Sequence, residues 1–357
     1  MITRKFAAGL LGAALALPWP MSADEDGAAQ VQALLQASQR AKQAYETQIE
    51  AAKSADARAS LDANDPDAAF ARQFLELGKK LGADPAAAES LIYAVQGDSD
   101  GSTGREAMEL LRRDHVNSPQ LEMLLNSYPH PRGPAAENLF RAIAERSTNR
   151  VLRAQSMLIL AESFKDYRPD EAEQVLRELM EKYGDVDTPA GPALDLARKG
   201  LVFVQKLSAG RAAPEITAGD LDGKGFKLSE LRGQVVLIVF CGEWCAPCRA
   251  LYPYERSLAE RMKDKPFALI SISSDPKETA LKTKQRERLT WRILWDGGST
   301  QGPITSEWQI QGWPNLYLID SRGFIREHWT GSPATQVMDE AIDKLVKEAE
   351  AAKPDGR

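Results

Sequence analysis

Apolar residues follow two different periods along this chain. From residue 24 to about 205 they recur every three or four positions, which is the spacing of one helix face. After that point, short apolar runs alternate with helical stretches. The second pattern is typical of an α/β fold, in which helices cover buried strands. We therefore expect an all-α N-terminal domain followed by an α/β domain whose mixed sheet is covered on both faces.

The first helices are expected to differ in length and in apolar character. A long helix with a thin apolar stripe is predicted at about 31–52. A second helix begins near Phe70 and ends at Gly78 or Gly82, and a third begins at Pro85.

Three clearer helices are expected at about 135–146, 150–165 and 170–183. Small and apolar residues at their facing positions resemble a tetratricopeptide-like helix pair near 135–184, but one such unit without a clear period does not predict a repeat array. Two interpretations stay open for this domain. It either forms a groove that binds a partner, or packs on and spaces the C-terminal domain.

Clusters of Gly, Pro and polar residues interrupt the helical pattern. Residues 97–104 predict a flexible turn, with Thr103 capping the next helix. A calcium loop is disfavoured there because the glycine stands at the wrong offset from the acids. Residues 187–192 predict a second break, and residues 208–210 mark the boundary between the two domains.

The C-terminal domain is expected to alternate strands with helices. The predicted strands are 226–228, 235–240, 267–272, 291–294, 316–319 and 324–329. The predicted helices follow Cys248 and lie at about 277–288, 303–309 and 337–346.

The candidate chemistry lies where the 235–240 strand meets the following helix, at Trp244-Cys245-Ala246-Pro247-Cys248-Arg249. The first N–H groups of a helix lack partners and carry partial positive charge, so a thiolate at Cys245 is stabilised there. Its pKa is expected to fall from about 8.5 toward the range of roughly 3.5 to 7.5. Cys248 lies one turn later on the same face, within reach of a disulfide. Pro247 fits the first turn because its missing N–H costs nothing there.

The remaining Cys and His residues do not complete a metal site. Zinc needs a second ligand pair, and Cys241, His115, His130 and His328 have no paired spacing. We therefore expect redox chemistry, without a metal or another cofactor. Cys241 is expected to be buried and inert, with an auxiliary thiol that exchanges with Cys245 as the alternative. His328 is expected to be a surface or packing residue.

Two segments resemble those of thioredoxin-fold proteins. Val-Phe-Cys-Gly-Glu-Trp-Cys-Ala-Pro-Cys-Arg at 239–249 resembles their active-site segment, and Gly-Trp-Pro-Asn-Leu-Tyr-Leu-Ile-Asp at 312–320 resembles their cis-proline loop and the strand after it. The lead-in at 213–233 resembles the redoxin and TlpA/ResA subgroup of extracytoplasmic thiol-disulfide oxidoreductases. The resemblance covers about residues 206–350.

This resemblance implies a role for each residue of the site. Cys245 attacks a substrate disulfide and Cys248 resolves the mixed disulfide, so that the two cysteines form a disulfide in turn. The bond between Trp313 and Pro314 is expected to be cis, which leaves the neighbouring backbone to pair with an extended substrate. Trp244 is expected either to shield one side of the sulfurs or simply to pack.

The chain departs from the family pattern at two acids. Val239 stands where many thioredoxins carry a buried Asp, and Leu251 stands where proteins of the ResA kind carry a Glu. Either acid would assist proton transfer at the second cysteine. Glu243 is the nearest substitute and is expected to face solvent. Asp275 is expected to cap the helix that follows it.

Composition and the N-terminus set the remaining expectations. A net charge of −6 without a basic stripe argues against nucleic acid as a partner. Arg4 and Lys5 precede an apolar run at 6–17 that is too short to span a bilayer, which is typical of an export signal over residues 1–23. A short membrane-anchored helix is the alternative. We expect a periplasmic or otherwise extracytoplasmic protein without a membrane span in the mature chain.

The predicted organisation is therefore a signal peptide (1–23), a helical domain (24–205), a thioredoxin-like domain (206–350) and a tail (351–357). The favoured function is an exported thiol-disulfide oxidoreductase that exchanges disulfides with client proteins and an unidentified electron donor. A redoxin-type thiol peroxidase is disfavoured because Gly242 stands where that motif has Thr or Ser. A non-catalytic binding protein that uses the helical domain is the other alternative, and the CxxC pair argues against it.

Overall fold

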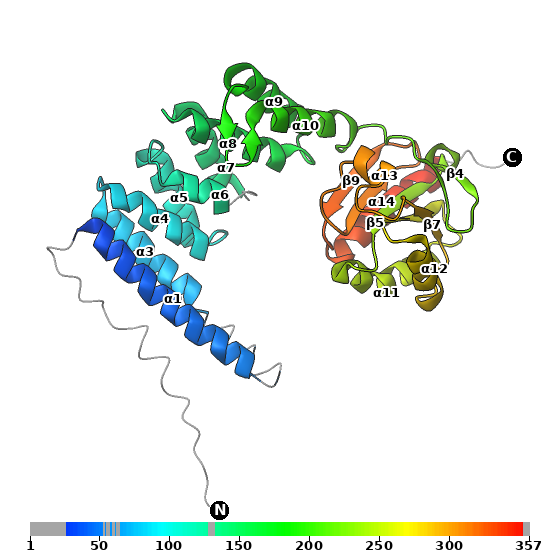
Figure 1. Ribbon diagram of the computed structural model, residues 1–357, viewed down its shortest axis with the longest axis horizontal. Helices are drawn as coiled ribbons and strands as arrows, with labels where there is room; N and C mark the ends of the chain where they lie inside the picture. Colours follow the sequence, from blue (N-terminus) through cyan, green and yellow to red (C-terminus); the bar gives the residue numbers. More distant parts are fainter. Residues whose placement is uncertain are drawn as a thin grey trace, which may run out of the picture. The chain divides into compact units, whose positions relative to one another are not determined.

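The computed structural model describes residues 26–52, 54, 58, 61, 65–127 and 133–352 (Figure 1). The predicted signal peptide, the last five residues of the predicted tail and His130 lie outside the described residues. The chain divides into two compact units, of which the second joins residues 161–178 to everything from 195 onward. The predicted domain boundary near residue 206 stays a prediction.

The described residues before 207 are almost entirely helical, which confirms the predicted all-α part. Its helices are α1 (Gly27–Ala51), α3 (Pro66–Leu81), α4 (Pro85–Gly97), α5 (Ser102–Asp114), α6 (Leu121–Ser127), α7 (Gly133–Arg146), α8 (Arg150–Phe164), α9 (Pro169–Tyr183) and α10 (Ala193–Lys206). A small hairpin of β1 (Asp187–Thr188) and β2 (Gly191–Pro192) takes the place of the plain break expected there.

Two helix boundaries test the predicted cap residues. α3 ends at Leu81 with Gly82 as its C-cap, whose φ of 57° lies in the region that favours glycine. The prediction that Thr103 caps α5 is wrong, because the N-cap is Gly101. Thr103 lies inside the first turn, and its N–H donates to the carboxylate of Asp98 at 3.0 Å. The acid before the turn therefore does the capping that the hydroxyl was expected to do.

A five-stranded mixed sheet forms the centre of the second unit, as predicted. Its strands are β5 (Val235–Cys241), β6 (Phe267–Ser273), β7 (Arg292–Trp295), β8 (Asn315–Ile319) and β9 (Ile325–Thr330), in the order β7-β6-β5-β8-β9. β5, β6 and β7 are parallel, whereas β8 runs antiparallel to β5, and β9 to β8. All seven residues of β5 are buried, so the strand that leads to the cysteines is the central one.

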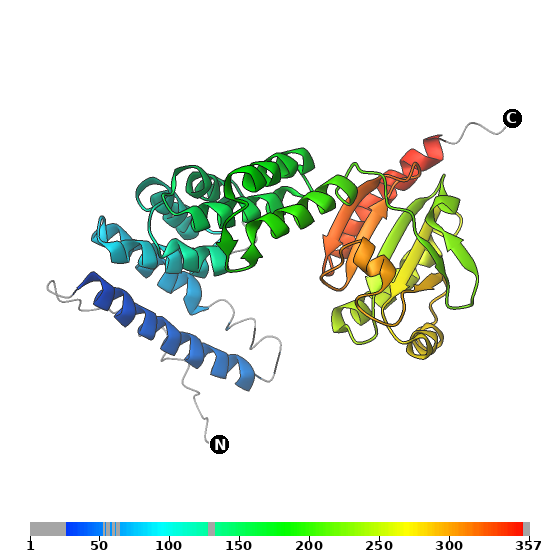
Figure 2. The same cartoon turned by 45° about the horizontal axis from the view of Figure 1, so that its top comes forward.

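Both faces of the sheet are covered, which confirms the fold class (Figure 2). α11 (Ala246–Arg261), α12 (Lys277–Arg286) and α14 (Thr335–Ala352) bury one face. The other face packs against α13 (Pro303–Glu307), the end of α10, the short helix η1 (Leu228–Leu231) and the hairpin of β3 (Thr217–Gly219) and β4 (Gly225–Lys227). Alternate β5 side chains enter the two cores, each contributing about 1.5–3 kcal/mol by burial. The strand end that carries the site is thereby fixed from both sides.

Within the ranges given above, no helix combines the length and the apolar character that crossing a bilayer requires.

Candidate active site

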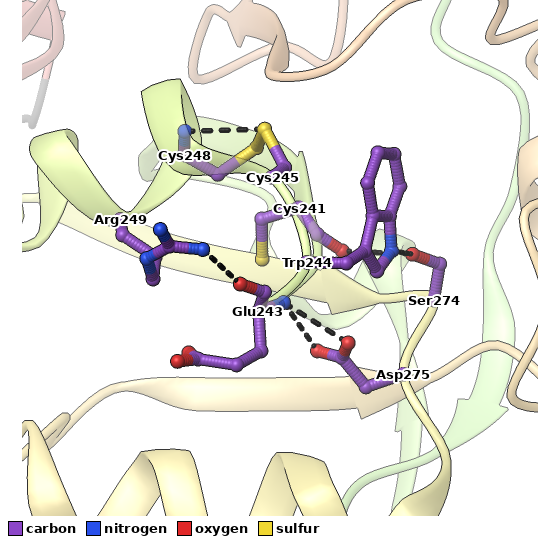
Figure 3. Close-up of a disulfide and its surroundings, with 8 residues drawn as sticks. All are labelled: Cys241, Glu243, Trp244, Cys245, Cys248, Arg249, Ser274 and Asp275. Carbon is purple, nitrogen blue, oxygen red and sulfur yellow. Dashed lines mark hydrogen bonds between the residues drawn. A yellow bond between two sulfur atoms is a disulfide. The ribbon is translucent and has the colours of Figure 1, made fainter.

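Cys245 lies at the junction of the central strand and α11. It is the N-cap residue of that helix, and its sulfur accepts a hydrogen bond from the backbone N–H of Cys248 at 3.2 Å (Figure 3). Pro247 occupies the first turn of the helix. A sulfur at an N-cap receives both a hydrogen bond and the positive end of the helix dipole, and both favour its thiolate form.

The two cysteines of the motif form a disulfide, with their Cα atoms 5.2 Å apart. Both belong to the buried cluster beneath α11, where Cys245 is 4% exposed and Cys248 is 1% exposed. Cys245 is thus the more accessible of the two cysteines, although only a small part of it reaches solvent. A client disulfide has to approach at this exposed part.

Two tryptophans border the disulfide. Trp244 is 54% exposed, and its indole N–H donates to the hydroxyl of Ser274 at 3.2 Å. Its ring meets the edge of Trp313 at a centroid distance of 5.5 Å. Trp244 is therefore an exposed rim residue and not a packed core residue. A large apolar ring of this kind, left in water, is a common contact for a partner chain.

The Trp313–Pro314 peptide bond is cis. The carbonyl of Pro314 accepts the N–H of Gly331 at 2.8 Å, which attaches this loop to the end of β9. In the described part of the chain, the N–H and C=O of Trp313 take part in no hydrogen bond. The ring of this residue packs against the cluster that contains both cysteines. A loop with a free backbone donor and acceptor at this place is able to pair with an extended peptide.

The loop before Cys245 is held by the end of β6. Both carboxylate oxygens of Asp275 accept the N–H of Glu243, at 3.0 and 2.9 Å, and the hydroxyl of Ser273 also donates to this carboxylate. Burial raises the pKa of Asp275, and these hydrogen bonds oppose that rise. The expectation that Asp275 caps α12 is wrong, because Pro276 is the N-cap and receives no side-chain bond. Asp275 instead fixes the turn that presents the cysteine.

Glu243 does not face solvent freely, contrary to expectation. Its carboxylate bonds to the hydroxyl of Thr283 and to the guanidinium of Arg286, at 3.1 and 2.7 Å. In Figure 3 this side chain points away from the two sulfurs. Glu243 is therefore held on α12 and does not replace the acid that the family carries beside the second cysteine.

A further buried acid, which was not among the predicted site residues, is Glu255, which is 3% exposed. It lies on the same face of α11 as Cys248, two turns along, and its Oε2 has no hydrogen-bond partner among the described residues. Burial raises the pKa of Glu255 to about 8, so that the carboxyl is mostly protonated at neutral pH. Its spacing from Cys248 was the available signal, because seven residues return to the same helix face.

Cys241 is buried, and burial together with the nearby charges of Glu255 and Asp275 raises the pKa of its thiol well above the ordinary value. In Figure 3 its sulfur points away from the disulfide. Both observations favour the inert interpretation, since the nucleophile in disulfide exchange is the thiolate.

Two histidines are described, and they differ in environment. His328 is a buried packing residue of β9 and not a surface one, and its two ring nitrogens lie beside Asp166 and Asn315. His115 follows α5, where burial lowers its pKa. Among the described residues, no three His, Cys, Asp or Glu side chains form a group suited to a metal ion.

Comparison with known proteins points to the same chemistry. Residues 209–328 match the AhpC/TSA family. The thiol-disulfide oxidoreductase ResA of a Bacillus cereus strain is 29% identical over 144 residues, which are 40% of this chain and 81% of that protein. ResA of Geobacillus kaustophilus is 27% identical over 146 residues, covering 40% and 82% of the two chains.

Solved structures show similar domains. The thioredoxin domain of a thiol-disulfide oxidoreductase from Bacteroides vulgatus is 26% identical, and the match covers 40% of this chain and 99% of that one with a TM-score of 0.36. The match of residues 209–328 to the AhpC/TSA family and the ResA relatives identify a thioredoxin-like domain in the second unit of this chain.

Proposed function

We propose that this chain is an exported thiol-disulfide oxidoreductase that acts on protein disulfides through Cys245 and Cys248. The observation that carries the proposal is the position of Cys245, whose sulfur caps α11, accepts the Cys248 N–H and is joined to Cys248 by a disulfide. The relatives named thiol-disulfide oxidoreductase support the reaction class.

The reduced form reacts in two steps. The Cys245 thiolate attacks one sulfur of a client disulfide, which forms a mixed disulfide and releases the other client sulfur as a thiolate. The Cys248 thiol then loses its proton and attacks Cys245, which releases the second client sulfur and forms the Cys245–Cys248 disulfide. The client gains two electrons, and an external dithiol donor has to return the protein to its reduced form.

The client binds at the unpaired backbone of Trp313 and at the exposed ring of Trp244. The free N–H and C=O of Trp313 are suited to pair with an extended client segment, while the exposed ring of Trp244 contacts its side chains. This arrangement favours an unfolded or flexible protein segment over a small molecule as the substrate. The proposed export rests on the pattern of residues 1–23, and it would place the protein where client disulfides persist.

The geometry disfavours peroxide as the substrate. A Cβ at Gly242 would lie 2.3 Å from the indole nitrogen of Trp244 and 2.9 Å from the hydroxyl of Ser274. A Thr or Ser, which the peroxidase motif requires at this position, would therefore displace the tryptophan. We expect slow, non-saturating turnover of hydrogen peroxide.

Reduction of insulin disulfides in the presence of dithiothreitol tests the proposal. The mature protein should accelerate the reaction, Cys245→Ser should abolish the acceleration, and Cys241→Ser, the matched control with the third thiol removed, should retain it. Equal activity of Cys245→Ser and the parent, or loss of activity in Cys241→Ser alone, would contradict the assignment of Cys245 as the nucleophile.

A further inference from the structure

His328 is held at both ends of its ring in the core of the second unit. Its Nδ1 lies 2.9 Å from Oδ1 of Asp166, and its Nε2 lies 3.0 Å from Oδ1 of Asn315. The ring of Tyr317 stacks on it at 4.4 Å, and Phe203 of α10 contacts it at 5.5 Å. Each contact joins a ring nitrogen to an oxygen that accepts hydrogen bonds, one from a carboxylate and one from an amide.

Asn315 connects this histidine to the cis-proline loop. It follows Pro314 directly, and its amide nitrogen donates to the hydroxyl of Thr330 at 3.2 Å. This bond directs the amide oxygen of Asn315 toward His328. The first residue after the cis peptide is therefore fixed by two side chains of β9, one on each side of its amide group.

The end of β9 also supports the rest of the loop. The N–H of Gly331 donates to the carbonyl of Pro314, and a Cβ at Gly312 would lie 2.9 Å from the methyl group of Thr330. The loop is therefore supported by Thr330 at Gly312 and by Gly331 at Pro314. A shift of this strand end would move the residues on both sides of Trp313.

Asp166 connects a distant segment of the chain to His328 on β9. It lies in the turn between α8 and α9, 162 residues before His328, in the part of the helices that belongs to the same compact unit as the sheet. Its side chain is 22% exposed, whereas that of His328 is 4% exposed. A partly buried carboxylate beside an imidazole gives a charge-assisted hydrogen bond, which is among the stronger kinds in proteins.

We propose that Asp166 and His328 are positioning residues, which hold Asn315 and the cis-proline loop in the geometry that binds client backbone. The helical segment 161–178 thereby takes part in client recognition without touching the sulfurs. This inference rests on the proposed function, because the loop needs a defined geometry only if it receives a client. Losing Asp166 lets the His328 ring turn, which frees the amide of Asn315 and loosens the backbone of Trp313.

The test compares a protein disulfide with a small one. Steady-state reduction of a fluorescent insulin derivative gives KM and kcat, and reduction of dithiobis(nitrobenzoic acid) by the pre-reduced protein reports the reactivity of Cys245 alone. Asp166→Ala should raise KM for insulin at least about fivefold, the low end of coupling between separate sites. Its kcat and its rate with the small disulfide should stay within about twofold of the parent.

Four further variants separate positioning from general destabilisation. Asp170→Ala is the matched control, since it removes an acid of the same segment that pairs with Arg211 at 2.9 Å but has no link to Asn315. It should leave KM unchanged. Asp166→Asn keeps an acceptor oxygen and should restore most of the affinity. His328→Phe, which keeps an aromatic ring against Tyr317, should raise KM as Asp166→Ala does, and the double variant should show no further increase.

An unchanged KM in both Asp166→Ala and His328→Phe would overturn the inference while leaving the proposed function intact. Equal loss of both substrates would also overturn it, because the effect would then lie at the sulfurs or in the fold. A parent that reduces neither substrate would contradict the proposed function itself.

Discussion

Replacing Glu255 with Gln should remove most of the pH dependence of the free energy of unfolding of the thioredoxin-like domain. Glu255 is 3% exposed, its Oε2 has no partner among the described residues, and burial raises its pKa from 4.5 to about 8. In the unfolded chain the carboxyl ionises near pH 4.5, whereas in the native protein it keeps its proton. Unfolding therefore releases a proton between these two pH values, and stability falls as the pH rises through this window.

The size of the effect follows from the shift. Each pKa unit corresponds to about 1.4 kcal/mol, so a rise from 4.5 to about 8 corresponds to roughly 5 kcal/mol of lost stability between about pH 4 and pH 9. Because water penetration and relaxation reduce such penalties, we expect a measured loss of about 2–5 kcal/mol. This is a large part of the roughly 5–15 kcal/mol that stabilises a typical domain.

Tryptophan fluorescence makes the measurement specific to one domain. Apart from Trp19 in the predicted signal peptide, all tryptophans of the chain lie between residues 244 and 329. Urea unfolding of the oxidised mature protein at several pH values from about 4.5 to 9 therefore reports the thioredoxin-like domain. Glu255→Gln should flatten the profile, although its buried amide lowers the absolute stability at acid pH.

Glu260→Gln is the matched control, because Glu260 is an exposed acid of the same helix that pairs with Lys263. It should retain the slope of the parent. If Glu255→Gln and the parent lose the same stability across this pH range, the carboxyl is not protonated in the native protein, and the reasoning from burial fails.

Two further predictions concern the site itself. Cys248→Ser should accumulate mixed disulfides with client proteins that Cys245→Ser does not form, because the resolving sulfur is absent; non-reducing electrophoresis detects them, and adducts on Cys241 would contradict the assignment. Asp275→Ala should destabilise the domain by about 2 kcal/mol in urea unfolding, since the N–H of Glu243 and the buried hydroxyl of Ser273 lose their acceptor. Asp222→Ala, which removes an exposed ion pair with Lys284, should have a far smaller effect, and equal effects would show that the hydrogen bonds to Asp275 add no stability.

Local patterns predicted most of the fold. The apolar run at 235–240 became the central strand β5, and the CxxC segment stands at the start of α11, because burial periodicity and helix-start residues act over a few positions. The same patterns misjudged the interior face of α11. Tyr254 continues the three- and four-residue apolar spacing of this helix, yet it is only partly buried, whereas Tyr252 and Glu255 are buried.

Residues whose role depends on a distant partner were not predictable. Asp275 follows a strand and precedes a helix, which is typical of a cap. Its carboxylate instead accepts a hydrogen bond from the N–H of Glu243, which follows the end of the neighbouring strand. His328 has no distinguishing neighbours in the sequence. Its contacts come from Asp166 and Asn315, which only the folded chain brings together. Pairings of this kind are set by the sheet order and by the packing of the turn between α8 and α9, and no local period encodes them.

The most direct test of the central claim is the titration of Cys245 in the reduced protein. The rate of alkylation by iodoacetamide is measured against pH, and mass spectrometry identifies the modified cysteine. A sulfur at the N-cap of α11 should be alkylated first and with a midpoint well below the ordinary thiol value of about 8.5. A midpoint at about 8.5, or earlier modification of Cys248 or Cys241, would contradict the account.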